Sequence, residues 1–228
     1  RTHSPSTTVM SGLKPLFIVF EGVDGAGTTT QCDRLCERLR LDNHEIVQTR
    51  EPGGTESGER IRELVLDPAL KDLDDLAELL LYGAGRRQHV AEVIEPALAA
   101  GKPVISDRYA QSSIAYQGAA RGLGSEVVDQ VNHLATGGLS ADFVMYLDLS
   151  VDIALQRRQK RCTTEDRLEQ AGVDFQAAVR QAYLELAAAD PEHSLLVDAA
   201  ASVEDQAVHV HQTLLARFPQ FPYRISDP

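Results

Sequence analysis

The chain has 228 residues, and its 22 Lys and Arg against 34 Asp and Glu give a formal net charge of −12 at pH 7. A chain of this length predicts one α/β domain with a sizeable core. The acidic balance argues against a nucleic-acid partner, because a phosphate backbone repels net negative charge. No apolar run is long enough to span a membrane and residues 1–14 contain no signal-peptide segment, so no membrane partner is expected.

The cysteines indicate a reducing compartment. There are three, an odd number, in no metal-like spacing. Cys32 and Cys36 share a predicted helix face with Leu35 and Leu39, so we expect buried thiols in a cytoplasmic protein.

Strands and helices are predicted to alternate after residue 15. The predicted strands are Leu16–Glu21, Glu45–Arg50, Pro103–Asp107, Phe143–Leu149 and Leu195–Asp198. The predicted helices are Thr28–Leu41, Ser57–Leu66, a long one from near Asp72–Asp74 to about Ala99, Gln111–Gln117, Glu126–Thr136, Val151–Lys160, Phe175–Ala189 and Val203–Phe218. This alternation predicts a three-layer α/β/α fold with a five-stranded parallel sheet and ligands at the carboxyl ends of the strands. We expect one domain over residues 16–218, a disordered extension or cloning remnant over residues 1–15, and a loose tail over residues 219–228.

The first strand runs into a Gly-rich turn and a helix, in the stretch LFIVFEGVDGAGTTTQ from Leu16 to Gln31. The spacing fits the phosphate-binding pattern G-x-x-x-x-G-[K]-[ST], with Thr28 at the lysine position. Glycines let backbone N–H groups converge on phosphate oxygens, and the helix N-terminus adds a positive dipole. The predicted ATP-binding residues are Gly22, Val23, Asp24, Gly25, Ala26, Gly27, Thr28, Thr29 and Thr30.

Oxygen ligands for a divalent cation follow the first and third strands. Thr29 stands where such loops supply a hydroxyl to Mg²⁺, and Asp107 ends an apolar strand. We therefore predict Thr29 and Asp107 as metal-binding residues. Asp24 is unusual inside a phosphate loop, because a carboxylate repels phosphate unless a metal or a cationic group lies beside it. It predicts a role at a metal or an acceptor nucleotide, and a local Asx turn is the alternative.

Two arginines at strand ends predict a second phosphate site. Arg50 precedes a Pro-Gly-Gly turn after the second strand, and Arg108 follows the third strand. A guanidinium can bind an acceptor phosphate through two hydrogen bonds. A surface Arg–Glu pair is the alternative for Arg50.

An aromatic and polar set predicts a nucleobase pocket. Tyr82 and Arg86 share a helix face, which suits a base stacked on the ring with the arginine reaching its edge or phosphate. A core-edge tyrosine with a solvated arginine is the alternative. Small donors and an amide able to read a base or sugar follow at Ser112, Ser113, Tyr116 and Gln117.

Basic residues cluster after the fourth strand, in the segment QRRQKRCTTEDR. They are Arg157, Arg158, Lys160, Arg161 and Arg167. In a chain of net charge −12, this run predicts a lid over about residues 156–170 that closes on ATP phosphates, rather than a solvated helix face.

Together these motifs resemble bacterial thymidylate kinase. The matching segments are FEGVDGAG, TREPGGT, LYGAGR, SDRYAQSSIAYQG, EDRLEQ and YLELAA, within about Leu16 to Phe218. The resemblance implies a P-loop NTPase fold, ATP-dependent phosphorylation of dTMP to dTDP, Mg²⁺ as cofactor and a homodimer. Carried over by motif, the acceptor side comprises Asp24 near the phosphate and sugar, Arg50 and Arg108 on the phosphate, Tyr82 on thymine, Arg86 near base and phosphate, and Ser113, Tyr116 and Gln117 on base and sugar.

One position departs from the family pattern. Thr28 replaces a lysine that bridges the β- and γ-phosphates, and losing such a donor costs typically ~10²–10³ in rate. The residue before Gly27 is Ala26 rather than a basic residue. In this respect the loop resembles the subtype of the family that takes its catalytic arginine from the lid. We therefore predict catalytic roles for Asp24, Arg108, Arg157 and Arg161, with Arg157 or Arg161 in place of the ammonium. The alternatives are a nucleotide-binding protein with little or no turnover and another small-acceptor kinase on the same fold.

Overall fold

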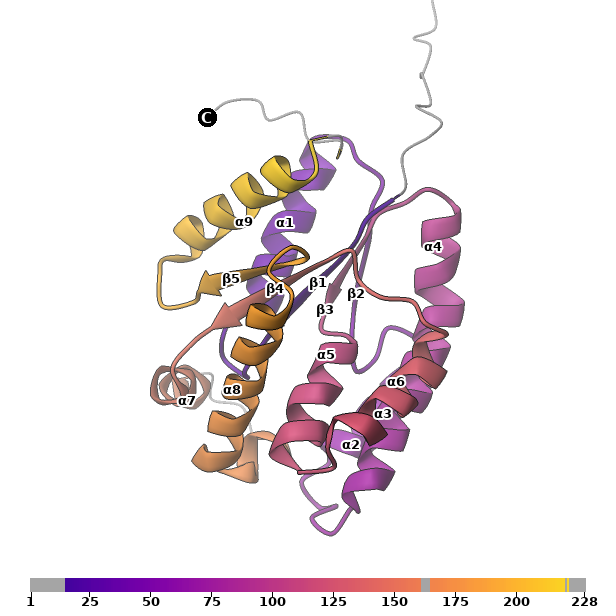
Figure 1. Cartoon of the computed structure of the whole chain (residues 1–228), viewed down its shortest axis with the longest axis vertical. Coiled ribbons are helices and arrows are strands. Elements are labelled where there is room, and N and C mark those ends of the chain that lie inside the picture. Colours follow the sequence, from indigo (N-terminus) through magenta and orange to yellow (C-terminus); the bar gives the residue numbers. More distant parts are fainter. Residues whose placement is uncertain (1–14, 161–164, 220, 222–228) are drawn as a thin grey trace, which may run out of the picture.

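A five-stranded sheet forms the centre of the computed structural model, which describes residues 15–160, 165–219 and 221 (Figure 1). The strands are β1 (Phe17–Gly22), β2 (Val47–Arg50), β3 (Val104–Asp107), β4 (Phe143–Asp148) and β5 (Ser194–Asp198). Every neighbouring pair is parallel, and the strand order is β2-β3-β1-β4-β5. The predicted five-stranded parallel sheet is confirmed, with each strand close to its predicted bounds.

The helices follow the predicted alternation. They are α1 (Thr28–Leu41), α2 (Glu56–Leu66), α3 (Asp75–His89), α4 (Glu95–Ala99), α5 (Ala110–Ser113), α6 (Ser125–Thr136), α7 (Val151–Lys160), α8 (Val173–Ala189) and α9 (Val203–Arg217). Two π-helical segments, η1 (Val90–Ile94) and η2 (Ile114–Ala120), and the short 3₁₀ turn η3 (Glu169–Ala171) complete the set. The long helix predicted from near Asp72–Asp74 to about Ala99 is therefore α3 and α4 joined by η1.

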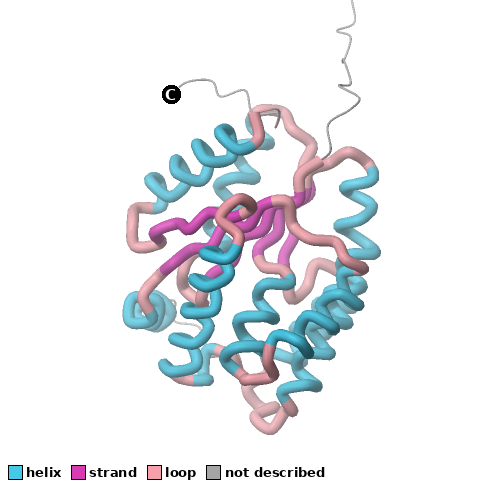
Figure 2. Tube along the Cα trace, in the orientation of Figure 1, coloured by secondary structure: helices cyan, strands magenta, loops and turns pink. Residues whose placement is uncertain are grey.

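Helices cover both faces of the sheet. α1 and α9 lie on one face, and α5 and α8 lie on the other (Figures 1 and 2). The central strand β1 is buried along its whole length, as a strand covered on both faces should be. Cys32 and Cys36, on α1, are 1% and 0% exposed, which confirms the predicted burial of these thiols.

The turn between β1 and α1 depends on glycine at two points. Gly25 and Gly27 have φ angles of 97° and 96°, a left-handed conformation that glycine adopts without strain. A Cβ at Gly25 would also lie 2.8 Å from the carbonyl oxygen of Ala154, so α7 packs directly against the loop. A side chain at Gly25 would therefore collide with α7.

Helix α3 packs against both α2 and α6 beside the β2 edge of the sheet (Figure 1). Among the residues that the structure describes, no helix has the length and apolar character needed to cross a membrane. Cys162, Arg161, the first fourteen residues and most of the predicted tail lie outside the described residues.

Candidate active site

Two connected depressions lie at the carboxyl ends of β1, β2 and β3, the edge at which ligands were predicted to bind. The larger, here called the wide cleft, has a volume of about 720 Å³ and contains the turn between β1 and α1. The smaller, here called the narrow pocket, has a volume of about 80 Å³ and lies between α3 and η2. The residues that line both are Asp24, Glu51, Arg62, Arg108 and Asp166.

The phosphate loop lines the wide cleft from Asp24 to Thr30. Gly22 and Val23, predicted in the same set, are buried behind it, and Val23 is only 2% exposed. These two residues shape the loop without facing the cleft. Arg50, Arg62, Arg108 and Arg157 also line the cleft, so an acidic chain does concentrate cationic side chains there.

Thr29 and Asp107 lie together, as predicted for a metal-binding pair. The Thr29 hydroxyl donates to Asp107 Oδ2 at 2.5 Å. Asp107 Oδ1 is buried and has no hydrogen-bond partner among the described residues. A hydroxyl and a carboxylate oxygen with a free lone pair suit a hard cation such as Mg²⁺. Within the described chain no three His, Cys, Asp or Glu side chains cluster as a metal cage, so such an ion would also need phosphate or water ligands.

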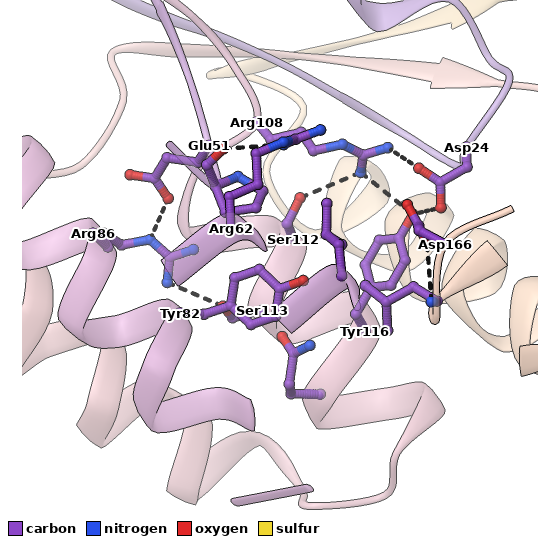
Figure 3. Close-up of a pocket in the computed structure, with 14 residues that line it drawn as sticks. Asp24, Glu51, Arg62, Tyr82, Arg86, Arg108, Ser112, Ser113, Tyr116 and Asp166 are labelled. Atoms are coloured by element: carbon purple, nitrogen blue, oxygen red, sulfur yellow. Dashed lines mark hydrogen bonds and ion pairs between the residues drawn. The ribbon is translucent and has the colours of Figure 1, made fainter. Parts of the chain in front are cut away.

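The carboxylate inside the phosphate loop has a cationic partner. Arg108 Nη2 donates to Asp24 Oδ1 at 2.8 Å, and the Tyr116 hydroxyl donates to Asp24 Oδ2 at 3.0 Å (Figure 3). Burial acts to lower the pKa of Arg108, but Tyr116 and Asp24 outweigh it, so this pKa is raised well above its ordinary value. The guanidinium therefore stays charged at the junction of cleft and pocket.

The backbone at Arg108 is held in an uncommon conformation. Its φ is +76°, a left-handed region that non-glycine residues seldom occupy. Its N–H donates to Phe20 O at 2.8 Å, and its carbonyl accepts from Ser106 Oγ at 2.7 Å. The next N–H, of Tyr109, donates to Glu21 Oε1 at 2.8 Å. These bonds stabilise the turn that directs Arg108 toward Asp24.

Glu21 is a residue of this region that sequence reasoning missed. It is 0% exposed, and its Oε2 accepts hydroxyl bonds from Ser112 at 2.7 Å and Tyr183 at 2.9 Å. Burial raises the pKa of its carboxyl group. A glutamate at the end of an otherwise apolar strand was the available signal, because a buried carboxylate requires several donors.

The predicted nucleobase residues do line one pocket. Tyr82 on α3 lies near Ser113 and Tyr116 (Figure 3), and Gln117 also lines the pocket. Ser112 also lines the pocket, although its hydroxyl is bonded to Glu21. The structure therefore brings the aromatic, hydroxyl and amide groups of two distant segments together.

Arg86 is buried, so the alternative of a solvated arginine is wrong. It is 2% exposed and lies in the wall of the narrow pocket. Its Nε donates to Glu51 at 2.8 Å, and its other nitrogens donate to Ser113 Oγ at 3.0 Å, Asn132 Oδ1 at 2.7 Å and the Tyr109 carbonyl at 3.0 Å. Most of its N–H groups are therefore hydrogen-bonded to other residues of the protein.

Arg50 forms the Arg–Glu pair that was the alternative for it. Its Nη2 lies 2.7 Å from Glu59 Oε2 while its side chain borders the wide cleft. Arg62, which sequence reasoning missed, lines both cavities and donates to the Pro52 carbonyl at 3.0 Å. Burial and the nearby Arg50 lower the pKa of Arg62. Arg62 lies one helical turn after Gly58 and belongs to none of the sequence motifs, so the sequence did not mark it as a site residue.

Comparison with known proteins identifies the family. A sequence-family model described as thymidylate kinase matches residues 20–210. The chain belongs to the thymidylate kinase family. It is 52% identical over 191 residues to the thymidylate kinase of Desulforudis audaxviator, covering 83% of this chain and 84% of the relative. It is 50% identical over 184 residues to that of Deinococcus radiodurans, covering 81% and 88%.

A solved structure agrees. The crystal structure of thymidylate kinase from Ehrlichia chaffeensis matches with a TM-score of 0.73 and 30% sequence identity, covering 89% of this chain and all of the other. The resemblance, the P-loop NTPase fold and the enzyme class are thereby confirmed: the chain is an ATP-dependent nucleoside monophosphate kinase. The alternative of a binding protein without catalysis is not favoured.

Two arginines of the basic segment of this kinase have different surroundings. Arg157 lies over the phosphate loop, where its Nη1 is 3.4 Å from Gly25 O and its Nη2 is 3.0 Å from Ala199 O. Arg167 instead turns away from the wide cleft, is buried, and donates to Glu78 and to Val65 O. Arg167, although part of the basic run from which a lid was predicted, therefore does not line the wide cleft, because the buried Glu78 carboxylate requires a cationic partner.

Proposed function

We propose that this kinase binds ATP in the wide cleft and dTMP in the narrow pocket, and transfers the γ-phosphoryl group where the two meet. The observation that carries this assignment is the shared lining of both cavities by Asp24, Arg62 and Arg108. An acceptor phosphate held there lies next to the phosphate loop, so the reaction needs positioning and charge neutralisation rather than covalent catalysis. No general base is required, since the acceptor oxygen is already anionic.

On the donor side, the loop from Asp24 to Thr30 would hold the phosphates through backbone N–H groups and the N-terminus of α1. Thr29 and Asp107 would hold Mg²⁺, which supplies charge neutralisation on the β- and γ-phosphates when bound. Arg157 would take the place of the missing lysine ammonium. Its support is its position over the loop and its two neutral carbonyl partners. We assign Arg161 to the same group from the sequence alone.

On the acceptor side, Tyr82 would stack on thymine while Gln117 reads the edge of the base. Arg108, with Arg50 and Arg62 nearby, would bind the acceptor phosphate. Arg86 would act mainly by fixing Ser113 and Glu51 in the pocket wall, since its N–H groups are largely committed.

We further propose a homodimer, acting in the cytoplasm. Leu76 and Leu80 on α3 are 42% and 52% exposed, and Val127 and Leu134 on α6 are 37% and 77% exposed. A Cβ at Gly83 of α3 would lie 2.8 Å from a Val131 methyl of α6, so these helices pack closely and present their apolar side chains together. Sedimentation at micromolar concentration tests this proposal. A monomer would contradict it, and Leu134→Glu should produce monomers if it is right.

The acceptor assay tests the function itself. ADP formation from Mg-ATP is measured with dTMP, dUMP, dCMP or dGMP, beside a control without acceptor. Turnover selective for dTMP is the expected result. Equal rates with and without acceptor would contradict the assignment of the narrow pocket.

A further inference from the structure

A buried carboxylate on α3 connects the narrow pocket with two arginines. Glu78 is 0% exposed, and its Oε1 accepts a hydrogen bond from Gln117 Nε2 at 2.6 Å. Its Oε2 accepts from Arg121 Nη2 at 3.2 Å and from Arg167 Nη2. Both carboxylate oxygens are therefore occupied, one by an amide and the other by two guanidinium groups.

This arrangement determines which way the Gln117 amide faces. A carboxylate paired with two guanidiniums has only acceptor oxygens, so the amide can meet it only with its NH₂ side. The carbonyl oxygen of Gln117 is then directed away from Glu78. Because Gln117 lines the narrow pocket and is itself 2% exposed, that oxygen is the acceptor this side chain can offer there.

The direction of this amide matters for pyrimidines. Thymine and uracil carry a donor N–H at ring position 3, whereas cytosine has an unprotonated acceptor nitrogen at the same position. We propose that Glu78 is a positioning residue for pyrimidine selectivity, which holds Gln117 as an acceptor and so favours rings with an N3–H over cytosine. This inference rests on the proposed placement of the acceptor base in the narrow pocket.

The isosteric change Glu78→Gln gives the sharpest test. Arg121 and Arg167 still require an acceptor, so the new amide oxygen should turn toward them and its NH₂ should face Gln117. Gln117 must then reverse, and its NH₂ rather than its oxygen faces the pocket. A donor facing an N3–H leaves two buried donors unpaired, so the ratio of kcat/KM for dTMP to that for dCMP should fall roughly 10–100-fold.

Three further variants separate this role from general stability. Gln117→Leu removes the reading group, and adding Glu78→Gln to it should leave the selectivity ratio unchanged if Glu78 acts through Gln117. Glu78→Asp keeps a negative charge for the two arginines, but its shorter side chain moves the carboxylate oxygen away from the Gln117 amide, so it should also lower the ratio. This variant provides the test if Glu78→Gln fails to fold. Asp148→Asn is the matched control, because it breaks the ion pair with Arg180 (2.6 Å), which lies outside both cavities.

The experiment measures kcat/KM for dTMP and dCMP in the full chain and in each variant. A fall in the ratio for Glu78→Gln and Glu78→Asp, with none for Asp148→Asn, supports the inference. A dTMP-selective native enzyme whose Glu78 variants lose rate equally on both substrates overturns the inference and leaves the proposed function intact. A native enzyme that phosphorylates neither nucleotide overturns both.

Discussion

Replacing Arg157 with Met should remove the charge that takes the place of the lysine ammonium at the phosphate loop. The Arg157 guanidinium lies 3.4 Å from Gly25 O and 3.0 Å from Ala199 O, and both partners are neutral carbonyls. Its charge therefore remains available to phosphate oxygens in the cleft. Arg108 and Arg50, by contrast, are paired with Asp24 and Glu59.

The expected loss follows from the value of one pre-organised donor. Removing such a donor costs typically ~10²–10³ in kcat, or about 2.7–4 kcal/mol of transition-state stabilisation. Thr28→Lys in the native background should raise kcat by less than about 10-fold, because the charge is already supplied. In the Arg157→Met background the same change should recover most of the loss, so the two substitutions should be strongly non-additive.

A coupled assay of ADP formation at saturating Mg-ATP and dTMP measures these four enzymes. Arg60→Met is the matched control, because the Arg60 side chain is 76% exposed and, among the residues that the structure describes, forms its ion pair with the surface residue Glu56. The reasoning is refuted if Arg157→Met stays within about threefold of the native rate, or if Thr28→Lys alone accelerates the reaction about 100-fold.

Three more predictions concern single side chains. Tyr82→Ala should raise KM for dTMP roughly 10–100-fold, since base–aromatic stacking is worth about 1–3 kcal/mol, while KM for ATP stays unchanged; a parallel rise in both would contradict a stacking role. Asp107→Asn should raise the Mg²⁺ concentration for half-maximal rate roughly 10-fold, measured by metal titration at fixed ATP, and an unchanged midpoint would exclude Asp107 from the metal site. Burial raises the pKa of Glu21 above its ordinary value of 4.5, so the folded chain binds that proton more tightly than the unfolded chain. Stability should therefore fall as pH rises from about 4.5 through the pKa of the folded chain. Glu21→Gln lacks this contribution, and urea titrations measure the free energy of unfolding of both proteins. The value for the variant minus the value for the native chain should increase across that pH range. A decrease in this difference would contradict the prediction.

The local motifs of this protein could be predicted from the sequence because their physics is short-range. The β1–α1 turn depends on glycines within a few residues of one another, and apolar periodicity determines where strands and helices begin and end. The family motifs also predict Tyr82, Ser113, Tyr116 and Gln117 as base-binding residues from the sequence, and in the structure these residues line one pocket. Even the departure at Thr28 was readable, because the lysine position lies inside a contiguous pattern.

Only the tertiary structure decided which charged groups meet. Asp24 and Arg108 are 84 positions apart in the chain, and their pairing depends on β1 and β3 being neighbours in the sheet. Arg167 belongs to the basic run that predicts a lid, yet it pairs with Glu78, 89 positions away in the chain. A buried carboxylate is stabilised by whichever donors the packing of distant helices brings to it, and no local pattern specifies those donors. The need of buried carboxylates for donors from distant segments explains three further features. These are the burial of Arg86, the strained turn at Arg108 and the orientation of Gln117.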